Sequence, residues 1–150
     1  MIDFCRSTPP SLQGKELFLL RNLSKGKGIG FFEDSGFYPD FILWITEGTK
    51  QRLVFIEPHG MKLETHPSIN PKVNLYKKLK AQETDARKKS KISGLSVDAF
   101  IMSATAFDDL QPHHGPEWDR AKYAEAHIFF GDEDKYGHIE AIVSLRRRPR

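Results

Sequence analysis

Residues 39–59 of this 150-residue chain read PDFILWITEGTKQRLVFIEPH. Two short apolar runs, Phe41 to Ile45 and Leu53 to Ile56, flank a polar segment that contains glycine. Such runs are typical of β-strands, and the polar segment between them predicts an antiparallel hairpin. Asp40 precedes the first strand and Glu57 follows the second. The hairpin therefore places both acidic residues at the same end of the sheet.

Two acidic residues at one end of a sheet predict a site for a single divalent cation. The carboxylates of Asp40 and Glu57 are hard oxygen ligands of the kind that Mg²⁺ prefers. A cation held there can orient a water molecule, polarise a phosphate and stabilise the leaving oxygen of a phosphodiester. The residue types in this pattern therefore favour phosphodiester hydrolysis with Mg²⁺ or Mn²⁺.

The composition fits one globular domain with a mildly basic surface. Hydrophobic residues make up 39% of the chain and include eleven Phe, enough to fill one core. The net charge is only +3, but Lys and Arg are clustered, which suits a polyanionic partner. The alternative is solvated helix faces and a frayed tail. The clusters are Lys77-Lys78-Lys80, Arg87-Lys88-Lys89-Lys91 and Arg146-Arg147-Arg148-Arg150.

The single cysteine and the lack of a long apolar run indicate a cytoplasmic protein. Cys5 has no second cysteine for an intramolecular disulfide or a multi-cysteine zinc site. No apolar run reaches the roughly 18 residues of a membrane helix, so no membrane partner is expected. We expect a linker or leader at residues 1–10, a single domain at 11–145 and a basic tail at 146–150.

The remaining pattern predicts an α/β fold with a central mixed sheet flanked by helices. Helices are expected at residues 11–23, with Ser11 as N-cap, from Pro71 to about residue 89, and at 117–125. Further strands are expected at residues 29–33, 97–102, 127–130 and 139–145, and a loop at 108–116. The strand at 97–102 follows a helix, so we expect it to lie parallel to the second hairpin strand.

The hairpin motif resembles that of the PD-(D/E)xK nuclease superfamily. Pro39-Asp40 and Glu57-x-His59 match its pattern, with His59 where the superfamily usually has Lys. Longer segments resemble the carboxy-terminal nuclease-like domain found behind DEAD/DEAH helicase modules in proteins similar to type III restriction subunits. These segments are residues 19–23, 28–33, 37–44, 55–60, 101–105 and 125–128. The resemblance implies a restriction-endonuclease-like core that cuts DNA with Mg²⁺.

The resemblance also implies roles for particular residues. Asp40 and Glu57 would bind the metal, and the main-chain carbonyl of Pro58 would complete the set. Glu16, expected on the first helix, matches the additional helical acid of the superfamily. It would bind the metal directly or through water, or else be an ordinary solvent-facing residue.

His59 is the main departure from the superfamily pattern. A neutral imidazole lacks the permanent charge of Lys, but it can act as a general base, or as imidazolium donate to the phosphate. Lys62 or Lys72 is a candidate to replace the missing charge. Lys72 together with Lys77, Lys78 and Lys80 would contact the DNA backbone, and such contacts are independent of sequence.

Two hypotheses for function follow, and a third is more distant. The first is a Mg²⁺-dependent DNA endonuclease domain of a restriction or phage-defence helicase–nuclease, targeted by a DEAD/DEAH helicase module of a parent protein. The second is a non-catalytic DNA-binding or assembly module that keeps the nuclease fold. The third is an RNA-directed nuclease or a repair enzyme. Cutting both DNA strands usually needs two active sites, so a homodimer is also an expectation.

Three other patterns favour structural readings. Residues 26–30 are glycine-rich, but they lack the P-loop pattern and lead into a strand. His113-His114, with Asp108 and Asp109 upstream, has no defined metal-ligand spacing, so an ordinary polar loop is favoured. Trp118 is the best candidate for a surface aromatic residue.

Overall fold

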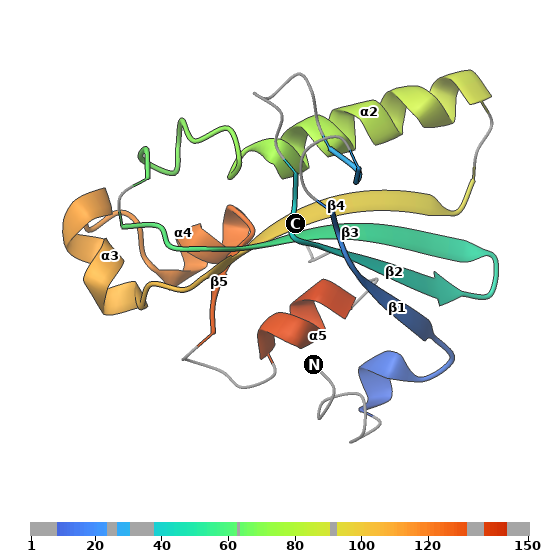
Figure 1. The fold of residues 1–150 in the computed structure, drawn as a ribbon, viewed down its shortest axis with the longest axis horizontal. Helices are drawn as coiled ribbons and strands as arrows, with labels where there is room; N and C mark the ends of the chain where they lie inside the picture. The colour runs from blue at the N-terminus through green and yellow to red at the C-terminus, as the bar shows by residue number, and fades with distance from the viewer. Residues whose placement is uncertain are drawn as a thin grey trace.

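The computed structural model has an α/β architecture built on a five-stranded mixed sheet with strand order β1-β2-β3-β4-β5 (Figure 1). It describes residues 9–23, 27–30, 38–62, 64–90, 93–131 and 137–143. The strands are β1 (Glu16–Arg21), β2 (Phe41–Glu47), β3 (Lys50–His59), β4 (Leu95–Ser103) and β5 (Ile128–Phe130). The first three strands pair antiparallel, and β3, β4 and β5 pair parallel. The predicted class, a central mixed sheet flanked by helices, is confirmed.

The predicted hairpin is present as β2 and β3. Phe41 pairs with Ile56 and Glu47 with Lys50, which leaves Gly48 and Thr49 as a two-residue turn. Gly48 has φ 57°, the left-handed conformation that tight hairpin turns require and that glycine adopts without strain. This register brings Asp40 and Glu57 to the same end of the sheet, as expected.

Helix α2 (Leu75–Ser90) runs along one face of the sheet and connects β3 to β4 (Figure 1). Its buried side chains pack on those of the sheet, and this core cluster comprises Ile42, Phe55, Leu75, Leu79 and Ala99. The helix was expected from Pro71, but residues 71–74 form turns instead. The parallel pairing of β4 with β3 confirms the expected arrangement.

The opposite face of the sheet is covered by α5 (Gly137–Val143), which lies below the sheet in Figure 1. The strand expected at residues 139–145 is therefore wrong in its described part. Ile139, Ile142 and Val143 are buried in the core on this face. Their spacing is that of one face of a helix. The expected strand came from treating the apolar and polar residues of this segment as alternating.

The first expected helix, at residues 11–23, is also wrong. A short 3₁₀ turn, η1 (Pro10–Leu12), is followed by Gly14 with φ 73° and then by β1. The leucines have near-helical spacing, but Leu17 to Leu20 form a continuous apolar run that pairs along β2. Pairing with the hairpin overrides the weak helical pattern.

Two short helices pack at the end of the sheet where β3 and β4 finish. Helix α3 (Phe107–His114) occupies the segment expected as a loop, so that expectation is wrong. Pro112 lies in the last turn of this helix. Helix α4 (Arg120–Glu125) and β5 agree with the predicted elements. Trp118 is only 6% exposed in a cluster with Leu110 and Tyr123, so the expected surface aromatic is a core residue.

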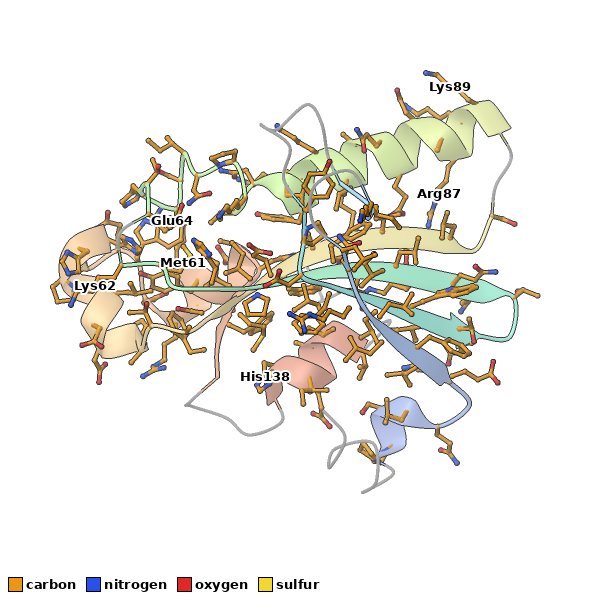
Figure 2. All side chains as sticks on the ribbon, viewed as in Figure 1. Met61, Lys62, Glu64, Arg87, Lys89 and His138 are labelled. Atoms are coloured by element: carbon orange, nitrogen blue, oxygen red, sulfur yellow. The ribbon has the colours of Figure 1, made fainter. Side chains whose placement is uncertain are left out.

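Side chains of α2 also cover the outer edge of β4 beyond the reach of β5. The Glu83 carboxylate accepts a hydrogen bond from the Val97 N–H at 2.9 Å, and Arg87 donates to the Leu95 carbonyl at 2.7 Å. Arg87 points from α2 toward β4, whereas Lys89 points away from the sheet (Figure 2). These contacts satisfy edge groups that would otherwise be open to pairing with another chain.

Some predictions concern residues outside the described ranges. Phe31 to Glu33, Cys5 and the tail arginines lie there, and the described Ile29 and Gly30 are not in a strand. None of the helices in the described ranges has the length and apolarity needed to span a membrane.

Candidate functional site

Asp40 and Glu57 meet at the ends of adjacent strands. The Asp40 N–H donates a hydrogen bond of 3.2 Å to Glu57 Oε2. The Glu57 side chain is only 13% exposed. Burial raises the pKa of Glu57, and the negative charge of Asp40 raises it further, while that hydrogen bond, Lys72 and His59 lower it. The site therefore combines two acidic groups whose repulsion a cation would relieve.

This acidic pair fits a magnesium ion better than a metal that needs a full set of protein ligands. No three His, Cys, Asp or Glu side chains within the described ranges form a metal-binding group. Mg²⁺ commonly keeps several waters and binds through one or two carboxylates, as Asp40 and Glu57 would supply. The role of the Pro58 carbonyl stays a prediction; Pro58 lies on β3 opposite Met102.

His59 contacts two carboxylates and lies at the last position of β3. Its Nε2 is 2.5 Å from Glu64 Oε1, and its Nδ1 is 4.0 Å from Glu57 Oε1. The hydrogen bond with His59 is the main cause that lowers the pKa of Glu64. A nitrogen this close to a carboxylate carries the proton, so Nε2 donates to Glu64. Glu64 lies on the segment between β3 and α2 (Figure 2).

Lys72 reaches the same cluster from the turn before α2. Its Nζ is 3.7 Å from Glu64 Oε1 and 3.4 Å from His59 Nε2. Buried Asn70 supports this turn, because its side-chain oxygen accepts the Lys72 N–H at 2.9 Å while its amide donates to Glu64 at 3.1 Å. Of the two lysines considered to replace the missing charge, the structure brings Lys72 to the cluster, whereas Lys62 is exposed beside α3 (Figure 2).

Glu16 is not brought to this site. It lies on β1, and its Oε2 accepts a hydrogen bond from Thr46 at the far end of β2 from Asp40. Five strand positions separate Thr46 from Phe41, which corresponds to about 17 Å along the sheet. The expected helical acid is thus on a strand and at the opposite end of the sheet.

A small pocket opens beside Glu57, between the sheet and the start of α2. Its polar lining comes from Glu57, Lys72 and His127, and the rest is mainly apolar, including Pro39, Phe55, Val73, Leu75, Ala99 and Ile101. The pocket holds about 10 Å³, room for about one water molecule. His127 was not predicted as a site residue, because a single histidine at the start of a strand carries no distinctive pattern.

Asp98 was also missed, although the sequence carries a signal for it. It interrupts the apolar run of β4 and is only 6% exposed. Its carboxylate lies 3.0 Å from Arg52 and 3.0 Å from His127 Nδ1, with Lys80 at 3.8 Å. Burial acts to raise the pKa of Asp98, but the hydrogen bond with His127 and the neighbouring charges together lower it. A charged residue in a buried strand indicates partners of this kind.

The basic residues of α2 differ in how far their charges are already paired. Lys80 Nζ lies 3.2 Å from Glu83 and also reaches Asp98. Lys77 Nζ donates to the neutral Asn74 amide oxygen at 2.8 Å, and Lys78 is exposed. Lys77 therefore suits a solvent-facing anion better than Lys80 does.

Comparison with known proteins adds no family assignment. The chain matches no protein-family model, no curated protein and no solved structure. The fold and the arrangement of these side chains are therefore the basis for any functional conclusion.

Proposed function

We propose that this chain is a Mg²⁺-dependent nuclease domain that hydrolyses phosphodiester bonds in DNA on a restriction-endonuclease-like core. The observation that carries the proposal is the meeting of Asp40 and Glu57 at one sheet end, joined by a 3.2 Å hydrogen bond. Burial and the neighbouring charge raise the pKa of Glu57, as expected of a carboxylate arranged to receive a cation.

The residues around this pair have complementary roles. Asp40 and Glu57 hold the ion, with the Pro58 carbonyl as a further ligand. When bound, Mg²⁺ or Mn²⁺ polarises the phosphate and orients water. Lys72 brings positive charge to within 3.7 Å of Glu64, and His59 lies 4.0 Å from Glu57; both side chains would face the substrate phosphate. Lys77 and Lys78 extend the positive surface along α2 and would contact the DNA backbone.

The wider assignment follows the sequence resemblance. The domain would belong to a cytoplasmic restriction or phage-defence protein in which a DEAD/DEAH helicase module selects the target. Backbone contacts alone carry no sequence information, so the domain itself would not choose a cut site. Cleavage of both strands would involve a homodimer.

One observation favours the alternative, a non-catalytic DNA-binding or assembly module. His59 replaces the usual lysine, and its Nε2 is already engaged by Glu64 at 2.5 Å. A group held in this way is less available to the substrate. The two functions differ in one respect, because only the nuclease needs a divalent cation.

The test is nicking of supercoiled plasmid by the purified protein with Mg²⁺ or Mn²⁺ and with EDTA. We expect metal-dependent nicking that is abolished in Asp40→Asn and Glu57→Gln. Glu47→Gln is the matched control, because Glu47 is an acidic residue at the other end of β2. Nicking lost in the two site variants but retained in the control supports the proposal. Salt-dependent DNA binding without any metal-stimulated nicking supports the binding module instead.

A further inference from the structure

His127 is fixed in one orientation by contacts on three sides. Its ring stacks between Tyr76, at a centroid distance of 4.0 Å, and Phe100, at 4.7 Å. Its Nδ1 is 3.0 Å from the Asp98 carboxylate and 3.0 Å from the Ala99 carbonyl. The backbone at His127 has φ 60°, a left-handed conformation that few residues other than glycine adopt and in which Asn, Asp and His are enriched.

These contacts determine which ring nitrogen carries the proton. Both neighbours of Nδ1 are acceptors, so Nδ1 is the donor, and in the neutral ring Nε2 has the lone pair. Asp98 also contacts Arg52 at 3.0 Å and Lys80 at 3.8 Å. No hydrogen bond to Nε2 is formed within the described part of the chain.

The same histidine borders the pocket beside the acidic pair. Glu57, Lys72 and His127 line this space, which has room for about one water molecule. Tyr76, Lys80 and Glu125 are the other ionisable groups near the ring or its carboxylate partner. A water in the pocket would be near both a carboxylate and an oriented imidazole.

We propose that His127 is the general base of the site, accepting a proton from the attacking water. The proposal rests on the proposed nuclease function. As the water oxygen bonds to phosphorus, one water proton passes to Nε2, and the bond from phosphorus to the leaving sugar oxygen breaks. The leaving oxygen takes a proton from solvent. The imidazolium is stabilised by Asp98, and it returns its proton to solvent after the products leave.

His127→Asn is the decisive variant. The asparagine amide can still donate to Asp98 and Ala99 in place of Nδ1, and asparagine tolerates the positive φ. Only the Nε2 lone pair and the ring stacking are lost. His113→Asn is the matched control, because His113 is exposed on α3. Tyr76→Phe keeps the aromatic stack and tests whether the phenol contributes.

The experiment combines kinetics with a direct view of the ring. We expect His127→Asn to lower kcat for plasmid nicking by about 10²-fold or more, the usual contribution of a general base, with KM for DNA little changed. The control variant His113→Asn should nick like the wild type. Nitrogen-15 NMR of the wild-type histidines should show the Nδ1–H tautomer at His127, and circular dichroism should show that His127→Asn is folded.

The outcomes separate this inference from the proposed function. An Nε2–H tautomer at His127 overturns the inference whatever the activity. If the wild type nicks DNA and folded His127→Asn has the same kcat, the inference fails and the nuclease assignment stands. If His127→Asn does not fold, its kinetics cannot be interpreted, and the tautomer of His127 in the wild type is then the test of the inference. If the wild type does not nick DNA at all, both proposals are overturned.

Discussion

The two histidines beside the acidic pair contact carboxylates in opposite ways. His59 donates from Nε2 to Glu64 at 2.5 Å and has Glu57 4.0 Å from Nδ1. His127 donates from Nδ1 to Asp98, and the residue borders the pocket. His59 therefore has acidic groups on both nitrogens, whereas His127 has one on a single nitrogen. The position of the carboxylate therefore determines which ring nitrogen of each histidine donates a hydrogen bond.

The two carboxylate partners also differ in their surroundings. The Glu64 side chain is 27% exposed, so solvent screens its contacts with His59 and Lys72. The Asp98 side chain is 9% exposed and contacts Arg52, whose side chain is 8% exposed. The partner of His59 lies on a connecting segment, and the partner of His127 lies in a central strand. The second histidine is consequently held by the more rigid framework.

The largest effect should come from removing the buried cation beside Asp98. We expect Arg52→Met to lower the free energy of unfolding by about 3 kcal/mol, because it leaves a buried carboxylate without its closest positive charge. Arg52 also donates to the Ile142 carbonyl at 2.8 Å, which ties α5 to the sheet. The measurement is urea unfolding followed by circular dichroism.

Lys80→Met is the control for that experiment. Its side chain is 45% exposed and it lies farther from Asp98, at 3.8 Å. We expect a loss of less than about 1 kcal/mol, as for other exposed ion pairs. Equal losses in the two variants would contradict the view that burial of the Arg52–Asp98 pair makes the His127 side of the site rigid.

The second effect concerns catalysis and compares the two histidines directly. We expect His59→Gln to lower kcat for plasmid nicking by about tenfold, against about 10²-fold for His127→Asn, because only the second removes a proton acceptor. The longer amide of His59→Gln can still donate to Glu64 in place of Nε2. A larger loss in His59→Gln than in His127→Asn would reverse the assignment of roles.

Local patterns predicted the hairpin and its acidic ends but not the elements that depend on distant contacts. Apolar runs and a turn specify β2 and β3 because both strands lie next to each other in sequence. Leu17 to Leu20 adopt a strand only because β2 offers an edge. The segment that ends at Val143 has helical spacing, but it was read as a strand. In each misread segment the short pattern admitted two structures, and packing selected one.

The sequence likewise predicted only the part of the site that lies at the end of the hairpin. Asp40, Glu57 and His59 are brought together by the pairing of its two strands, so their proximity could be inferred from the sequence. Glu64 and Lys72 reach His59 through a turn whose shape depends on buried Asn70. His127 lines the pocket from the position before β5, a strand that pairs with the edge of β4 opposite β3. No spacing rule connects these positions, so only the folded chain reveals them.

A third histidine, His114, shows the effect of burial on a pKa where the ring contacts a hydroxyl group instead of a carboxylate. His114 is 5% exposed, and its Nδ1 is 2.5 Å from the hydroxyl of Tyr123. Burial lowers the pKa of His114 from 6.5, and nearby His66 and His113 lower it further. The folded state therefore binds this proton more weakly than the unfolded chain does. Stability should be complete above about pH 6.5 and decrease as the pH falls below it.

Urea unfolding at a series of pH values checks this dependence. His114→Asn should lose part of the decrease in stability below pH 6.5, because its amide does not titrate and its oxygen can still accept the Tyr123 hydroxyl. His113→Gln, a change at an exposed histidine, should retain most of it. The same slope in the wild type and His114→Asn would show that the titrating group lies elsewhere.

The smallest effect concerns how each lysine of α2 contributes to DNA binding. Lys77 contacts the neutral Asn74, whereas Lys80 already lies 3.2 Å from Glu83. A lysine that contacts phosphate releases counterions, so Lys77→Ala should reduce the slope of log K against log salt by about 0.9. Lys80→Ala should change the slope less, because its charge is largely compensated by Glu83 and Asp98 in the free protein. Fluorescence anisotropy in EDTA at several salt concentrations measures both slopes without cleavage. Equal changes would mean that DNA displaces the ion pairs of Lys80, and the network that holds Asp98 and His127 would then rearrange when substrate binds.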